Sequence, residues 1–405
     1  MRIDRRGFIR STGLGVTAAG VIGAPAPGQD LPDVVVVGAG AFGAWTALHL
    51  RERGARVTLL DAYGPGNARA TSGGETRQIR VGYGDREQYS RWALRALSAW
   101  RAREQEFGRT LLYPIGRLQM ADAWTPAMDA TRAVFDRLGV TYERLEGRDL
   151  PRRFPAMGFD GVGAALYEPG AGIIKAREAI TTVASAFERK GGTLAVARVR
   201  PGAAAGRRLG TVAGSGKAFS AASFVFACGP WLRTLFPGLP GRRIMTPRRE
   251  VFFFGTPPGD ARYSWPNLPN FSEAAFYGFP DLDGRGLKVS PVGGDHEMDP
   301  DAEERVPSAE LIARSRAYVA LRFPGMKGQP LLESRVCQLE NTADEHFLID
   351  RHPDYDNVWI AGGGSGHGFK HGPVVGEYIA DRVEGKPPDP ALASTFALRT
   401  APRDR

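Results

Sequence analysis

Residues 33–43 read DVVVVGAGAFG and open a pattern of strand, turn, helix and strand. The β-branched run 34–37 is typical of a fully buried strand, and residues 44–53 predict a helix after the glycine turn. Residues 56–60 predict a second strand, which ends at Asp61. Glycines with GxGxxG spacing between a strand and a helix, followed by this acid, indicate a Rossmann-type dinucleotide site.

Each residue of this motif has its own physical role. Gly38 allows the tight turn, Gly40 lets the backbone approach a pyrophosphate, and Gly43 lets the helix pack closely on the strand. The N–H groups at the helix N-terminus attract phosphates, and the Asp61 carboxylate can accept a hydrogen bond from a ribose hydroxyl. The residues expected at the dinucleotide are Gly38, Gly40, Ala41, Phe42, Gly43 and Asp61. The motif itself leaves NAD and FAD open.

The extreme N-terminus predicts an export signal. Residues 5–10 read RRGFIR, which resembles a twin-arginine signal, and the small residues 24–26 offer a cleavage pattern. The apolar stretch 11–23 is too short and too glycine-rich for a stable membrane span. We therefore expect residues 1–30 to be a signal peptide that engages the twin-arginine export machinery and directs the protein to the periplasm or the outside of the cell. The alternative is an ordinary basic N-terminus.

Composition excludes several classes of protein. A length of 405 residues suits two interleaved domains. The net charge of +9 is spread without a long basic run, so nucleic acid is not an expected partner. The two cysteines, Cys228 and Cys337, do not make a disulfide scaffold, and no cluster has zinc spacing, so we expect no metal.

Four stretches of the chain share an order with one known family. They are ATSGGETRQIR at 70–80, YGFP at 277–280 leading to GLK at 286–288, VC at 336–337 leading to DEHFLID at 344–350, and SGHGFK at 365–370. Together they resemble the monomeric sarcosine oxidase family, within the wider D-amino acid oxidase superfamily. The resemblance covers essentially the whole mature chain.

The resemblance implies an α/β (α+β) monomer in which two domains are interleaved. A Rossmann-like, discontinuous FAD-binding domain is expected from residues 31–112, 165–240 and 332–395. A substrate domain with a mixed β-sheet is expected from residues 113–164 and 241–331, and residues 396–405 form a tail. Further pattern reading predicts helices at 178–190 and 373–383 and strands at 219–227, 249–254 and 286–291.

The same resemblance implies the FAD contacts. Cys337 corresponds to the cysteine that carries the flavin 8α-methyl group as a thioether; the alternative is a buried cysteine beside non-covalent FAD. The glycine-rich loop 362–368 and the helix after it are expected to face the flavin pyrimidine, where negative charge builds up on reduction. The further residues expected to contact FAD are Ser72, Thr76, Arg77, Cys337, Gly364, Gly366, His367, Gly368 and Lys370.

The resemblance also implies the reactive groups. Lys288 corresponds to a lysine over the flavin that stabilises the superoxide formed when O2 is reduced. Arg80 and Lys370 correspond to a pair that binds the substrate carboxylate. Tyr277 matches a pocket tyrosine, and Arg77 matches an arginine that tunes the flavin electrostatically. Lys288, Arg77 and Tyr277 are the expected catalytic set, and Arg80, Lys370 and Tyr277 the expected substrate-binding set.

Three positions depart from the family pattern. Val292 and Leu339 stand where the family has a histidine and a tyrosine, and Gly73 stands where a histidine is common. Apolar pocket residues favour a larger apolar group over a small one. We therefore expect an N-methylated or cyclic secondary amino acid bulkier than sarcosine.

The implied reaction is oxidation of a C–N bond to an imine with reduction of O2 to H2O2. One alternative is a dehydrogenase of the same fold that passes electrons to a quinone or a carrier. Another is a flavin-binding protein without activity.

Overall fold

The computed structural model describes residues 33–398 apart from 215, 240–243 and 295. The predicted signal peptide therefore lies outside the described residues. The described part belongs to one compact unit. None of its helices is both long and apolar enough to cross a membrane.

A six-stranded sheet is built on the predicted first strand. Its order is β23-β24-β15-β1-β2-β9, and every neighbouring pair is parallel except β23 with β24. The strands are β1 (Val34–Val37), β2 (Val57–Asp61), β9 (Thr193–Val196), β15 (Ser223–Phe226), β23 (Leu348–Arg351) and β24 (Val358–Gly362). The predicted strands 34–37 and 56–60 are confirmed as β1 and β2, at the centre of this sheet.

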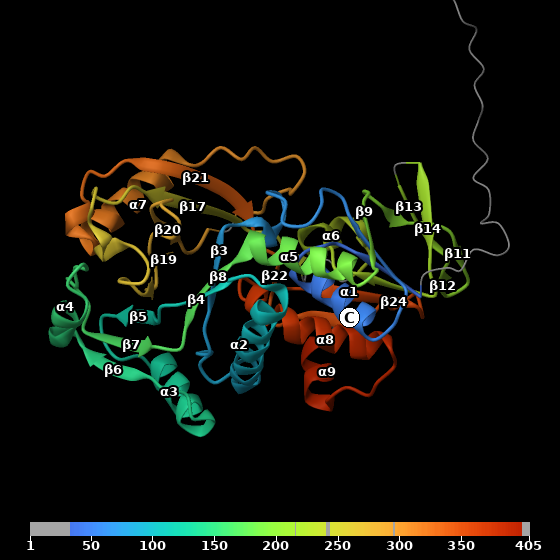
Figure 1. The fold of residues 1–405 in the computed structure, drawn as a ribbon, viewed down its shortest axis with the longest axis horizontal. Helices are drawn as coiled ribbons and strands as arrows, with labels where there is room; N and C mark the ends of the chain where they lie inside the picture. The colour runs from blue at the N-terminus through green and yellow to red at the C-terminus, as the bar shows by residue number, and fades with distance from the viewer. Residues whose placement is uncertain (1–32, 215, 240–243, 295, 399–405) are drawn as a thin grey trace, which may run out of the picture. The chain divides into compact units, whose positions relative to one another are not determined.

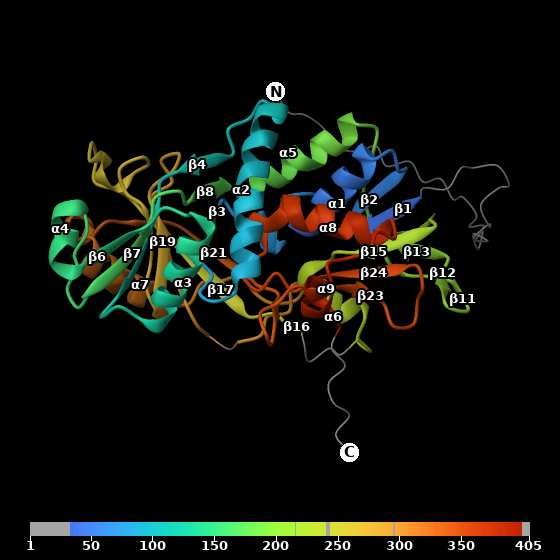
Figure 2. The ribbon, with the colours of Figure 1, turned by 90° about the horizontal axis from the view of Figure 1, so that it is seen from below.

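Helices cover one face of this sheet (Figure 2). They are α1 (Ala41–Glu52), α5 (Ala176–Arg189) and α8 (Gly372–Val383), with α2 (Glu87–Phe107) beside α8. Val34 and Val36 pack in the core beneath these helices, whereas Val35 and Val37 pack in a second core on the opposite face, as strand alternation requires. The three predicted helices are confirmed, although α1 begins three residues early, with Gly40 as its N-cap.

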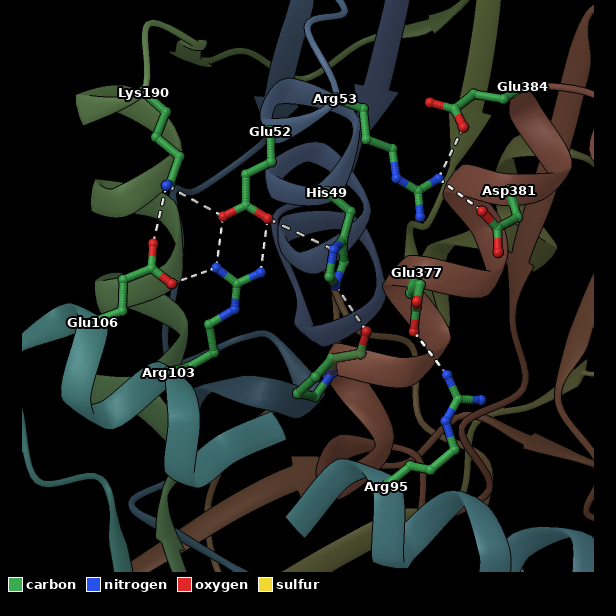
Figure 3. A network of polar contacts seen from close by, with 11 residues as sticks. His49, Glu52, Arg53, Arg95, Arg103, Glu106, Lys190, Glu377, Asp381 and Glu384 are labelled. Carbon is green, nitrogen blue, oxygen red and sulfur yellow. Dashed lines mark hydrogen bonds and ion pairs between the residues drawn. The ribbon is translucent and has the colours of Figure 1, made fainter. Parts of the chain in front are cut away.

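Ion pairs join these helices at their outer surface (Figure 3). Arg103 of α2 binds both carboxylate oxygens of Glu52 at the end of α1, at 2.6 and 2.7 Å. Lys190, just after α5, lies 2.9 Å from Glu106. We call the group labelled in Figure 3 the helix-surface network; it consists of His49, Glu52, Arg53, Arg95, Arg103, Glu106, Lys190, Glu377, Asp381 and Glu384.

An eight-stranded mixed sheet forms the second half of the fold (Figure 1). Its order is β21-β17-β20-β19-β18-β5-β7-β6, and helix α7 (Ala309–Arg322) packs on one face. The strands are β5 (Arg117–Ala121), β6 (Glu143–Glu146), β7 (Ala164–Glu168), β17 (Arg248–Phe254), β18 (Asn270–Ser272), β19 (Phe276–Phe279), β20 (Leu287–Pro291) and β21 (Leu331–Gln338). The predicted strands 249–254 and 286–291 are confirmed as β17 and β20. The domain boundaries stay a prediction; β7 and β21, which they assign to the FAD-binding domain, pair in this sheet.

Strand alternation divides the eight-stranded sheet into two chemically different faces. Leu287 and Val289 of β20 point into the core beneath α7, together with Leu118 of β5. Lys288 and Arg117 alternate with these residues and therefore lie on the other face. That face meets β3 (Thr76–Ile79), because the Lys288 Nζ donates to the Thr76 Oγ1.

The strand predicted at 219–227 is confirmed over its second half, as β15, but its first half belongs to another strand. The chain forms β14 (Lys217–Ser220), which pairs antiparallel with β13 (Thr211–Gly214), and then β15, which enters the parallel sheet. The Ser223 N–H donates to the Asp33 carbonyl, so the change of sheet falls between the two strands.

The remaining elements connect these sheets. The strands are β4 (Leu112–Pro114), β8 (Gly172–Lys175), β10 (Arg200–Pro201), β11 (Ala204–Ala205), β12 (Arg208–Leu209), β16 (Ile244–Met245) and β22 (Asn341–Thr342). The helices are α3 (Pro126–Leu138), α4 (Leu150–Arg153), α6 (Leu232–Leu235) and α9 (Pro390–Phe396).

Candidate functional site

A cavity lies at the glycine turn after β1 and next to the end of β2. The predicted cofactor residues that line it are Gly38, Gly40, Ala41, Phe42, Asp61, Ser72, Arg77, Gly364, Gly366 and Gly368. These residues come from four separate segments of the chain, at 38–42, 61, 72–77 and 364–368. The fold therefore brings the glycine-rich loop 362–368 to the same cavity as the motif at 38–43.

The glycines of the motif differ in what they contact. Gly38 has φ +103°, and a Cβ there would lie 2.3 Å from the Ala227 carbonyl oxygen. A Cβ at Gly43 would lie 1.8 Å from the Gly38 oxygen. A Cβ at Gly40 would meet only the Ser72 Oγ, at 3.4 Å. Gly38 and Gly43 are thus required by the packing of the turn, whereas Gly40 leaves the backbone open to the cavity.

Polar groups at the cavity suit a dinucleotide. The Asp61 carboxylate accepts from the Ala39 and Tyr63 N–H groups, both at 2.8 Å, and burial raises its pKa. The Ser72 Oγ accepts from the Ala41 N–H at the start of α1. The sequence reasoning missed Glu340, a buried carboxyl on this cavity whose Oε1 has no partner and whose pKa burial raises to about 7. These groups fit the polyol and phosphate portions of FAD.

Lys288 is buried, with 4% of its surface exposed. Its Nζ donates to the Thr76 Oγ1 at 3.0 Å and lies 4.9 Å from the centre of the Phe279 ring. Burial lowers its pKa to about 7; the positive charge of Arg77 lowers it further and the carboxylate of Glu75 raises it. Thr76 and Lys288 line a second cavity, separate in its lining residues from the first.

Cys337, Tyr277 and Arg77 gather around Lys288. Cys337 lies opposite Arg249 in the pairing of β21 with β17, on the face that carries Lys288. Burial raises the pKa of Tyr277, and the charges of Arg77 and Cys337 also act on it. The Arg77 guanidinium donates to the carbonyls of Thr71 and Thr76, which hold it at the cavity wall. Four residues predicted from separate motifs thus lie in one neighbourhood.

Arg80 and Lys370 meet at one aromatic ring. The Arg80 guanidinium carbon lies 4.5 Å from the centre of the Tyr83 ring, and the Lys370 Nζ lies 5.4 Å from it. Lys370 donates to the Tyr83 hydroxyl at 3.0 Å and to the His367 carbonyl at 2.9 Å. Arg80 donates to the Gly82 carbonyl. The structure therefore brings the predicted carboxylate-binding pair together.

No carboxylate neutralises this pair. Within the described part of the chain, neither Arg80 nor Lys370 has an acidic group within 4.0 Å. Burial lowers the pKa of Lys370 well below its usual value, and the charge of Arg80 lowers it further. Burial also lowers the pKa of His367, next to Lys370, to about 3. An arriving carboxylate would raise the pKa of Lys370 again and so favour its charged form.

Arg117 and Glu168 complete this cluster, and the sequence reasoning did not include them among the site residues. They lie directly opposite each other in the pairing of β5 with β7. Glu168 accepts from the Val81 N–H at 2.6 Å, and burial raises its pKa. Burial, and then the charge of Arg80, lower the pKa of Arg117 to about 9. The sequence offers no local signal that distinguishes Arg117 from the other arginines.

The remaining predicted cofactor residues do not line the main cavity. Gly43 serves the packing of the turn, Thr76 lies at the second cavity, and Cys337, His367 and Lys370 line neither cavity. Their contact with FAD stays a prediction.

The three departures from the family pattern have different settings. Gly73 has no room for a side chain, because a Cβ there would lie 1.7 Å from the Asn67 carbonyl oxygen. Leu339 lines the main cavity. Val292 is 45% exposed, so it does not contribute an apolar wall to an enclosed pocket.

Comparison with known proteins gives a consistent result. Residues 33–382 match the family model DAO, described as FAD dependent oxidoreductase. Monomeric sarcosine oxidase from Bacillus sp. (strain NS-129) is 31% identical over 357 residues, which are 86% of this chain and 92% of the relative. N-methyl-L-tryptophan oxidase from Salmonella heidelberg (strain SL476) is 28% identical over 368 residues, which are 88% of this chain and 95% of the relative.

A solved structure shows the same fold. Fructosyl amine: oxygen oxidoreductase (Amadoriase I) from Aspergillus fumigatus aligns with a TM-score of 0.77 and 22% identity, over 93% of this chain and 91% of that one. The dinucleotide cavity, the clustered reactive side chains and the family match agree. The chain belongs to the DAO family of FAD dependent oxidoreductases, and it is an enzyme of the sarcosine oxidase type.

Proposed function

We propose that this enzyme oxidises the C–N bond of a secondary amino acid, N-methylated or cyclic and larger than sarcosine, and reduces O2 to H2O2. The observation that carries the proposal is the convergence of Arg80 and Lys370 on Tyr83, with no ion-paired carboxylate among the described residues. Buried cations without a counter-ion are costly unless an anion arrives. The names of two relatives, sarcosine oxidase and N-methyl-L-tryptophan oxidase, supply the class of N-methyl amino acids.

The overall reaction balances with three reactants: the amine, water and O2. The amine loses two electrons and two protons as a C–N single bond becomes a C=N double bond. Water then cleaves the imine into a carbonyl compound and an amine. O2 takes up the two electrons and two protons to give H2O2. FAD, when bound, supplies the two-electron acceptor that connects the two half-reactions.

The protein's own groups position the reactants. Arg80 can grip a carboxylate with two parallel hydrogen bonds, and Lys370 adds a point charge. Tyr277 lies on the same face of the eight-stranded sheet as Lys288, on the neighbouring strand β19. Lys288 supplies a positive charge in a buried place, where it stabilises the anion formed from O2.

The test is anaerobic reduction of the purified flavoenzyme. Sarcosine, N-methylalanine, N-methylglutamate, proline and pipecolate are mixed with the enzyme, and loss of flavin absorbance is followed by stopped flow. The proposal expects rapid bleaching by a secondary amino acid larger than sarcosine and release of H2O2 on readmission of air. If none of these compounds bleaches the flavin, the reading as an amino acid oxidase is wrong.

A dehydrogenase would behave differently at the second step. It would bleach anaerobically but reoxidise slowly in air and rapidly with a quinone. The oxidase proposal predicts that Lys288→Met slows reoxidation by O2 with little change in anaerobic reduction. Equal reoxidation of the variant and the parent enzyme would favour the dehydrogenase.

We also infer that the flavin is bound covalently to Cys337 and that the protein is exported in its folded state. Support comes from the place of Cys337 on the same sheet face as Lys288 and from the arginine pair Arg5-Arg6 in the sequence. Acid precipitation should leave the yellow colour in the pellet, and Cys337→Ser should release it to the supernatant. Fractionation of cells that express the parent or an Arg5→Lys/Arg6→Lys variant tests the export.

A further inference from the structure

Arg117 is a buried cation that the proposed reaction has not used. It is 9% exposed and begins β5 on the sheet face that carries Lys288 and Tyr277. Its guanidinium donates to the Gln119 Oε1 at 2.9 Å and to the Ser272 Oγ at 3.0 Å, and its Nε has no hydrogen-bond partner among the residues that the structure describes. Both partners are neutral.

The surroundings of Arg117 contain more basic groups than acidic ones. Its charge and those of Arg80 and Lys370 act on one another. Glu168 is the carboxyl group that acts on these cations. It binds the backbone N–H groups of Val81 and Gly82 and forms no ion pair within 4.0 Å in the described part of the chain. Three basic side chains thus face one carboxyl group.

This excess has a physical meaning. A buried guanidinium whose hydrogen-bond partners are all neutral destabilises the fold. The carboxyl group opposite Arg117, Glu168, binds backbone N–H groups instead of pairing with this guanidinium. One amino acid carboxylate at Arg80 and Lys370 still leaves one basic group in excess. The unpartnered Nε gives Arg117 a free donor for a second anion.

We propose that the substrate is a secondary amino acid with a second carboxylate on its side chain, and that Arg117 binds this second carboxylate. N-alkylated aspartate and glutamate have this chemistry. The inference rests on the proposed function and names the substrate class within it. It replaces the expectation of an apolar side chain, one support for which was Val292, now seen to be 45% exposed.

The kinetic experiment compares two substrates of the same shape. kcat/KM is measured with N-methylglutamate and with N-methylglutamine, whose side chain has an amide in place of the carboxylate. The parent enzyme should prefer the acid by about 30- to 100-fold, the value of a close buried charge pair. Arg117→Met should bring the ratio to about one, and Arg117→Lys should restore part of it. Because the readout is a ratio, a general loss of activity does not imitate the result.

A binding experiment separates this inference from the proposed function. The oxidised holoenzyme is titrated with glutarate and with butyrate, and the change in the flavin spectrum is recorded. Glutarate should bind the parent enzyme about 30- to 100-fold more tightly, and Arg117→Met should remove the difference. If no amine bleaches the flavin but glutarate binds in this way, the proposed function fails and the dicarboxylate site stands. Equal affinities in the parent enzyme, or a preference unchanged in Arg117→Met, would overturn the inference.

Should Arg117→Met fold poorly, Arg117→Gln keeps a polar side chain that can still contact Ser272. Flavin content and melting temperature establish that each variant is folded before the ratio is taken. A folded variant of either kind that keeps the parent preference contradicts the role of Arg117.

Discussion

Two clusters of charge in this molecule follow opposite rules. In the helix-surface network, Arg103 binds Glu52 and Glu106, and Arg95 of α2 binds Glu377 of α8 at 2.9 Å (Figure 3). We call the half-buried Arg80 and the buried Arg117 and Lys370 the buried cation cluster. In it, no basic side chain has an acidic partner within 4.0 Å in the described part of the chain. The basic side chains of the first cluster have acidic partners and are partly exposed to solvent. Those of the second cluster lack ion-paired carboxylates and are less exposed.

The difference separates a structural role from a binding role. Ion pairs at a surface contribute little individually and depend on salt, but they require nothing from outside the protein. A buried cation without a partner destabilises the fold and is maintained when a ligand needs it. Substitutions in the buried cation cluster should therefore lower activity and raise stability. Substitutions in the helix-surface network should lower stability and leave activity nearly unchanged.

The largest effect is expected from Lys370→Met. Loss of one of the two cations at the substrate carboxylate should lower kcat/KM on the order of 1000-fold for every amino acid substrate. The folded protein should become more stable, because a buried basic group is replaced by an apolar side chain of similar length. Steady-state kinetics and thermal unfolding of the same samples measure both quantities. A variant that loses activity and melting temperature together would contradict the contrast between the clusters.

The pH dependence of stability sharpens the same point. The pKa of Lys370 is lowered on folding, so the unfolded chain binds more protons than the folded chain between the two pKa values. This group therefore destabilises the folded state below the unfolded pKa of about 10.4, and the penalty declines as pH rises toward it. Lys370→Met should flatten that part of the profile of unfolding free energy against pH.

Lys288 is intermediate between the two clusters in how far its charge is compensated. It is buried, but the nearby carboxylate of Glu75 raises its pKa and so favours its charged form. With a pKa of about 7, its protonated fraction falls about tenfold for each pH unit above that value. The rate constant for flavin reoxidation by O2 should fall in parallel between about pH 7 and pH 9. Glu75→Gln should move the profile to lower pH. A rate that does not change with pH would show that the charge of Lys288 does not assist this step.

The parts of the site that could be predicted depend on local rules. Gly38 has a positive φ, and Gly43 lies against the Gly38 carbonyl, so the spacing of the two glycines identifies them. Lys288 alternates with Leu287 and Val289 in β20, and a period of two is visible in the sequence. The resemblance to a family then located Cys337 and Tyr277 relative to it.

The parts that were missed depend on which strands pair. Arg117 faces Glu168 because β5 pairs with β7, about fifty residues further along the chain, and no local pattern distinguishes this arginine from the others. The prediction of one continuous strand at 219–227 was wrong in its extent for a related reason. An apolar run does not show that β14 joins one sheet and β15 another. The lack of room for a side chain at Gly73 also could not be predicted, since it results from the contact with the Asn67 carbonyl in the folded loop.

A smaller effect is expected in the helix-surface network from Arg103→Ala. The Arg103 side chain is 16% exposed, holds Glu52 with two hydrogen bonds and lies 5.6 Å from the Trp45 ring. Its removal should lower the free energy of unfolding by about 1 to 2 kcal/mol, between the values for exposed and buried pairs. kcat/KM should stay within about twofold of the parent, because Arg103 belongs to the helix-surface network and not to the residues of the candidate site. Urea unfolding and steady-state kinetics test the two halves of the prediction.

The smallest effect is expected from Arg95→Ala. Arg95 and Glu377 have side chains that are 57% and 42% exposed, so water and salt already screen their attraction. The free energy of unfolding should change by less than about 0.5 kcal/mol, and the change should vanish in about 0.5 M NaCl. Arg103→Ala is the matched control, since it lies on the same helix and belongs to the same network but is largely buried. If both variants lose the same stability, the degree of burial does not determine what these ion pairs contribute, and the contrast with the buried cation cluster would have to rest on charge excess alone.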